Sequence, residues 1–266
     1  MDVYISPLNP INFTHKTDEN SGELQRSYVQ QFIAGDVIKL QVVGKKNIFV
    51  NFVIGGLAVR ANVINGDDYN IYWHKLNTNS YNKNELLDVR IVVTDNGVTE
   101  IYYSTNYIEI VEECDSLKLV EYGNSSNITA FNTYFGDGFT FSLRVPVGFK
   151  STSIKNRIEN ETFRNQNQEL KMLYSAPYTT KTMIIGDGLG VPTWMGTLFN
   201  SIFCLSDVTI DGVKYVRSDD SVPEMQGGID GYPLHIYTME VEQVETKPTA
   251  EVKTINEDFG EEFSEW

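Results

Sequence analysis

Residues 48–64, IFVNFVIGGLAVRANVI, hold two apolar runs that are separated by the pair Gly55-Gly56. Glycine supplies the positive φ angles that a tight hairpin turn needs, so this stretch predicts an antiparallel β-hairpin. An Asn96-Gly97 pair between two further apolar runs repeats the arrangement. Short strands at this spacing over residues 28–111 are typical of an antiparallel sandwich of the immunoglobulin-like kind. We place this sandwich in a first domain at residues 1–113.

Residues 114–245 predict a second domain that combines strands with one principal helix. Asp211-Gly212 separates two apolar runs and predicts another hairpin. Residues 188–206 carry no charge, and their apolar side chains recur at the spacing of one helix face. These side chains are Val191, Trp194, Met195, Leu198, Phe199, Ile202 and Phe203. One helix packed on an antiparallel sheet makes this domain α+β, and the whole chain mainly β.

Composition supports the same fold class and narrows the possible partners. The chain has 23 Asn and only 6 Ala, which disfavours a helical bundle because Ala is the best helix former. Its net charge of −15 makes nucleic acid an unexpected partner, because phosphate contacts need clustered Lys and Arg. Residues 246–266 form an acidic tail that is too polar to fold alone.

Residues 148–169 predict an arm inserted in the second domain. The segment is polar, contains one Gly and no Pro, and lacks a clean hydrophobic period. An insertion of this length is usually either disordered or functional. Its charge is mildly basic within an acidic protein, and its cations include Lys150, Lys155, Arg157 and Arg164.

The chain offers no pattern that predicts catalysis, a cofactor or a metal. The glycines of residues 185–190 do not match the spacing of either phosphate-binding template. The three His residues are scattered, without the spacing of metal ligands or of a catalytic triad. Cys114 and Cys204 are isolated, which favours two reduced residues of the core. Neither a secretory signal nor a membrane span is expected from the sequence.

Four aromatic residues close in sequence leave two interpretations open. Tyr69, Tyr72, Trp73 and Tyr81 could form a platform for a sugar. The alternation of side chains along a strand would instead place some of them in the core, and we favour that interpretation.

Four segments of the second half carry a resemblance to a known class of protein. They are FTFSLRVPVGF at 139–149, LYSAPYTTKTM at 173–183, GLGVPTW at 188–194 and IDGVKYVR at 210–217. Through them, residues 120–245 resemble virion proteins of tailed bacteriophages of gut Bacteroidota, crAss-like phages included. The resemblance implies a non-enzymatic building block near the tail, in a hub, baseplate or neck, made in the host cytoplasm and carried in the virion. The alternative function is a glycan-binding or adhesin module, whose partner would be a surface glycan.

Such a building block would contact copies of itself and other virion proteins, and the sequence suggests where. Charges are costly to desolvate at interface cores, so the neutral polar face of the predicted helix suits an interface. That face carries Thr193, Thr197, Asn200 and Ser201. A second hypothesis docks the acidic tail on a neighbouring subunit through Phe259, Phe263 and Trp266, with Lys155, Arg157 and Arg164 of the arm as a candidate partner. A fully solvated tail is the alternative.

Overall fold

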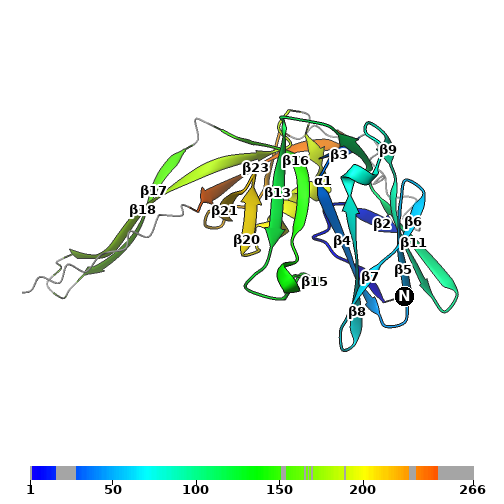
Figure 1. Ribbon diagram of the computed structural model, residues 1–266. Helices are drawn as coiled ribbons and strands as arrows, with labels where there is room; N and C mark the ends of the chain where they lie inside the picture. The colour runs from blue at the N-terminus through cyan, green and yellow to red at the C-terminus, as the bar shows by residue number, and fades with distance from the viewer. Residues whose placement is uncertain are drawn as a thin grey trace, which may run out of the picture.

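A computed structural model describes residues 2–15, 28–150, 154–164, 166, 168, 170–188, 190–227 and 232–244 (Figure 1). Over these residues the chain is mainly β, with several antiparallel sheets and one α-helix, which confirms the predicted fold class. The acidic tail, with Phe259, Phe263 and Trp266, lies outside the described residues.

The N-terminal part is a sandwich built from three sheets. The first sheet has the order β1 (Val3–Ile5), β4 (Val37–Lys45), β8 (Tyr69–Asn77) and β7 (Asn62–Asn65). The second has the order β2 (Phe13–His15), β11 (Val98–Ser104), β10 (Val89–Asp95), β5 (Phe49–Ile54) and β6 (Leu57–Arg60). The third joins β3 (Val29–Ile33), β12 (Tyr107–Val111) and β9 (Leu86–Leu87), and a short 3-10 turn, η2 (Thr78–Ser80), follows β8.

The sandwich follows the sequence prediction, with two local differences. Gly55, Gly56, Asn96 and Gly97 all adopt positive φ in their turns, as expected. The apolar run at 57–64, however, forms two strands, because buried Ala61 separates β6 of one sheet from β7 of the other. One pairing is parallel, between β3 and β12.

The second part is a sheet that closes on itself around a core. Its strands are β13 (Leu117–Gly123), β16 (Phe141–Phe149), β18 (Leu170–Ile185), β23 (Leu234–Gln243), β21 (Val213–Arg217) and β20 (Asp207–Ile210). Each pairs with the next, and β20 pairs with β13, so the ring is complete. Four shorter strands and a 3-10 turn complete this part: β14 (Thr129–Ala130), β15 (Thr133–Tyr134), η3 (Gly136–Gly138), β19 (Val191–Pro192) and β22 (Glu224–Gln226).

The predicted helix is α1 (Thr193–Ile202), and its apolar stripe faces this core. Six of the seven predicted stripe residues are buried, and the seventh, Trp194, is half-buried. Gly196 faces the ring of Tyr237, where an added Cβ would lie 2.6 Å from Cε1. Only glycine therefore lets the helix approach β23 this closely.

Residues of the N-terminal segment cross into the second part. Leu8 is fully buried in the core cluster that contains α1 and the closed sheet. The Tyr122 hydroxyl donates to the carbonyl oxygen of Leu8 at 2.7 Å, and burial raises the pKa of Tyr122 well above its ordinary value. Arg144 of β16 binds Asp36 of the sandwich through two hydrogen bonds, of 2.9 and 3.0 Å. The two parts are therefore packed and bonded together across the predicted boundary at residue 113.

None of the helices in the described part of the chain is long and apolar enough to cross a membrane.

Candidate assembly surfaces

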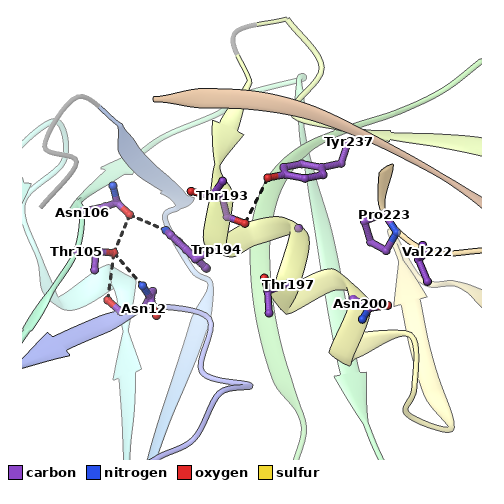
Figure 2. A pocket seen from close by; sticks show the side chains of 11 residues that line it. Asn12, Thr105, Asn106, Thr193, Trp194, Thr197, Asn200, Val222, Pro223 and Tyr237 are labelled. Carbon is purple, nitrogen blue, oxygen red and sulfur yellow. Dashed lines mark hydrogen bonds between the residues drawn. The ribbon is translucent and has the colours of Figure 1, made fainter. Parts of the chain in front are cut away.

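A groove beside α1 is lined by three of the four residues on the neutral helix face that the sequence predicts as an interface. It has a volume of about 640 Å³ and lies between the helix, the sandwich and the loop before β22 (Figure 2). Thr193, Thr197 and Asn200 line it and are exposed, while Ser201 is half-buried and donates to the Thr197 carbonyl oxygen at 3.2 Å.

The sandwich wall of this groove is held by hydrogen bonds between neutral groups. Trp194 Nε1 donates to Asn106 Oδ1 at 3.0 Å, and Thr105 Oγ1 donates to the same atom at 3.1 Å (Figure 2). Asn12 lies behind Thr105, and its amide nitrogen is 3.5 Å from Thr105 Oγ1. None of the residues that line the groove carries a charge. The groove is thus an uncharged surface of polar and apolar side chains, and charged residues are depleted at interface cores.

The predicted arm is part of a long β-hairpin, and the sequence does not predict this hairpin. β17 (Lys155–Arg164) pairs antiparallel with residues 170–180 of β18, with a register shift between Glu161 and Thr162. We call this two-stranded element the ribbon. It projects from the closed sheet on the side away from the sandwich (Figure 1).

Both edges of the ribbon lack a neighbour among the described strands. β17 is the terminal strand of its sheet, and β23 pairs with β18 only from Thr180 to Ile185. An unpaired edge presents free N–H and C=O groups to another chain. A two-stranded hairpin is also only marginally stable by itself.

The two faces of the ribbon differ in chemistry, because side chains alternate along each strand. One face continues the side of the sheet on which Met183 and Ile185 are buried, and we call it the core-side face. It carries three exposed apolar residues: Ile158 (62% exposed), Leu170 (59%) and Met172 (66%). The opposite, outer face carries Phe163 and Tyr174 together with Glu159 and Glu161.

Two of the cations predicted to bind a partner are paired within the chain. Lys155 and Arg157 both bind Glu240 of β23, with Arg157 Nη2 2.6 Å from Glu240 Oε2. Hydrogen bonds from Lys155 and then from Arg157 lower the pKa of Glu240. Arg157 also lies 3.6 Å from Asp219. Both cations therefore attach the base of the ribbon to the body.

Arg164, the third predicted cation, lies at the far end of the ribbon. Its Nη1 donates to the carbonyl oxygen of Gln168 at 3.1 Å. The structure does not bring Arg164 together with Lys155, with which it shares β17.

A separate cleft of about 730 Å³ lies where the β14–β15 hairpin covers the sandwich. Val43 and Ile71, which are register partners on β4 and β8, line it. Tyr4, Tyr69 and Phe131 also line it, and each is more than two-fifths exposed. Phe131 has a φ of 51°, which is rare for a bulky residue, and such strain collects at functional sites.

Only one of the four clustered aromatic residues reaches this cleft. Tyr69 does, whereas Tyr72 is buried and donates to the carbonyl oxygen of Lys45. Trp73 packs edge-on against Phe139 at 5.7 Å, and Tyr81 packs on the sandwich core. The prediction that some of these residues lie in the core is therefore confirmed by Tyr72, while Trp73 and Tyr81 are partly buried against the core.

In the segments that the structure describes, no three His, Cys, Asp or Glu side chains are grouped so that they could hold a metal ion. Cys114 and Cys204 are free thiols, but Cys114 is only half-buried and Cys204 is exposed, so the prediction that both belong to the core is wrong.

Comparison with known proteins identifies no relative: no family model, no curated protein and no solved structure matches the chain.

Proposed function

We propose that the protein is a structural subunit of a tailed-bacteriophage virion, near its tail, and that it assembles in several copies. The observation that carries this proposal is the ribbon, which exposes Ile158, Leu170 and Met172 and has unpaired edges among the described strands. An exposed apolar surface of this kind marks a site of protein–protein contact. The resemblance of residues 120–245 to phage virion proteins is the reason for proposing that this contact is made in a virion.

Copies of the same chain are the partner that the ribbon suits best. Its two free edges have equivalent hydrogen-bonding capacity, so the edge of one copy can pair with that of the next. Contacts of this head-to-tail kind build rings when the rotation closes. The neutral groove beside α1 supplies a second uncharged surface for a neighbour.

We expect the double variant Ile158→Lys/Met172→Lys to remain monomeric at concentrations where the unchanged chain self-associates, because two ammonium groups would have to be desolvated at the contact. Light scattering over a concentration series measures this. Val98→Lys is the matched control, because Val98 has the same 62% exposure as Ile158 but lies on the sandwich.

If the double variant self-associates at the same concentration as the unchanged chain, the ribbon is not the contact between copies. The virion setting has its own test. Mass spectrometry of purified particles of the encoding phage should find the chain in many copies, and its absence from them would reject a virion role.

A second candidate function, binding of a neutral surface glycan, rests on the cleft at Tyr4, Tyr69 and Phe131. Exposed tyrosines combine an apolar ring with a polar tip, which suits the faces and hydroxyls of sugars. We expect Tyr69→Ala to reduce the affinity for a bound polysaccharide at least tenfold in calorimetry. Tyr103→Ala, which changes a tyrosine outside the cleft, should leave it unchanged; equal loss in both variants would contradict a site here.

A further inference from the structure

The core-side face of the ribbon differs from the outer face in charge as well as in apolar content. Its β17 residues are Asn156, Ile158, Asn160, Thr162 and Arg164, so it carries a guanidinium group and no carboxylate. Lys181 of β18 lies on the same side at the base, where its Nζ donates to Gln243 Oε1 at 2.6 Å. Between a cation at each end, this face thus carries only uncharged side chains, among them the exposed Ile158, Leu170 and Met172.

The outer face carries charges of both signs. Glu159 and Glu161 share it with Lys155 and Arg157, which bind Glu240, and Glu242 lies beside its base. The pKa of Glu242 is raised by burial and by the nearby charges of Asp219 and Glu159. An acidic segment would therefore meet carboxylates on the outer face, where Lys155 and Arg157 already bind Glu240, and no carboxylate of β17 on the core-side face.

The chain itself leads an acidic segment to the base of the ribbon. Glu242 pairs with Thr180, the residue at which the free edge of β18 begins. The last described contact is the bond from the Val244 N–H to the Lys214 carbonyl oxygen, at 3.0 Å. The described chain therefore ends at the base of the ribbon, one strand away from the free edge of β18.

The length of that segment is sufficient to reach all of the ribbon. A ten-residue strand such as β17 is about 33 Å long, at about 3.3 Å per residue. The 22 residues from 245 to 266 extend to about 70 Å, so the last aromatic residues can fold back anywhere along it.

The chemistry of the acidic tail, residues 246–266, matches the core-side face. The tail holds six carboxylates and two lysines, a net charge of −4, and its aromatic residues are Phe259, Phe263 and Trp266. These rings can bury the exposed Ile158, Leu170 and Met172, while carboxylates approach Arg164 and Lys181.

We propose that in the free subunit the acidic tail of the same chain covers the core-side face of the ribbon and restrains assembly. This inference rests on the proposed function, because it names the regulation of the proposed contact. The cover keeps the apolar ribbon from pairing with other copies until a partner displaces the tail.

Disulfide trapping tests the position of the tail. In a Cys114→Ser/Cys204→Ser background, Ser264→Cys is combined with Asn160→Cys on the core-side face or with Glu161→Cys on the outer face. Mild oxidation of dilute protein should trap the first pair within monomers at least tenfold faster than the second. Equal rates, or linkage only between chains, would overturn the proposal, the latter by assigning the tail to a neighbouring copy.

Assembly tests the restraint. A chain that ends at Glu245, and the variant Phe259→Ser/Phe263→Ser/Trp266→Ser, should self-associate at an at least tenfold lower concentration than the full chain. The control Thr246→Ser/Thr249→Ser/Thr254→Ser keeps the aromatic residues and should behave as the full chain. Unchanged or weakened association on truncation would overturn the restraint. Disulfide trapping measures the position of the tail within monomers. Its outcome therefore does not depend on whether the ribbon is the contact between copies, which the Ile158→Lys/Met172→Lys variant tests.

Discussion

Leu8→Ala is expected to destabilise the chain by about 3 kcal/mol, although residue 8 belongs to the sandwich end of the sequence. Leu8 is fully buried among the residues of the closed sheet and α1. Removing its side chain loses the transfer free energy of the buried atoms and leaves a cavity that rigid strands cannot fill. The bond from the Tyr122 hydroxyl is to the backbone of Leu8, so it survives the substitution.

Urea unfolding measures this loss, with Leu57→Ala as the control. Leu57 is 63% exposed in the β5–β6 hairpin, so its truncation should change the free energy of unfolding by less than about 0.5 kcal/mol. A change below about 1 kcal/mol for Leu8→Ala would show that the N-terminal segment does not stabilise the second part.

The parts of the fold that were predictable are those set by neighbours in sequence. The turns at Gly55-Gly56, Asn96-Gly97 and Asp211-Gly212 all have positive φ, because these residues tolerate that conformation at little cost. The apolar stripe of α1 was predictable because a 3.6-residue period depends only on the helix itself.

Contacts between distant segments could not be predicted in the same way. The closure of the sheet depends on β18 pairing with both β16 and β23, and no local pattern encodes that choice. The burial of Leu8 depends on a partner more than 100 residues away, because its bonded neighbour is Tyr122.

The ribbon was missed for a further physical reason. Most side chains of β17 are exposed, so its sequence lacks the alternation of apolar and polar residues that marks a half-buried strand. The sequence therefore predicts only an arm that is either disordered or functional. The feature of the sequence that could have indicated the ribbon is the set of apolar residues in β18, such as Leu170 and Met172, that do not belong to the core.

The candidate assembly surfaces likewise combine residues that the sequence predicts with residues that it does not. Thr193, Thr197 and Asn200 were identifiable from helix spacing, and the structure places all three in the groove. Lys155 and Arg157 were selected on charge alone, and charge does not reveal that Glu240 of the same chain binds them. The set of Tyr4, Tyr69 and Phe131 joins three separate strands and turns, so no window of sequence contains it.

Asp36→Ala is expected to cost about 3 kcal/mol, because it leaves the guanidinium group of Arg144 unpaired at the junction of the two parts. The side chains of Arg144 and Asp36 are only 16% and 9% exposed, and they form a two-point ion pair. Asp36 also accepts the N–H of Ile33 at 2.9 Å, which fixes the turn before β4. Urea unfolding of Asp36→Ala, Arg144→Ala and the double variant separates the pair from the turn.

A coupling of about 2 kcal/mol in this cycle would assign most of the loss to the ion pair, whereas additive effects would assign it to the turn. Asp2→Ala is the matched control, because its pair with Lys45 is about half exposed and should contribute little to stability. The pair matters for the proposed assembly as well. Arg144 lies on β16, which leads into the ribbon, so a looser junction would let the ribbon and the sandwich move relative to one another. Asp36→Ala should then weaken self-association even where both parts remain folded.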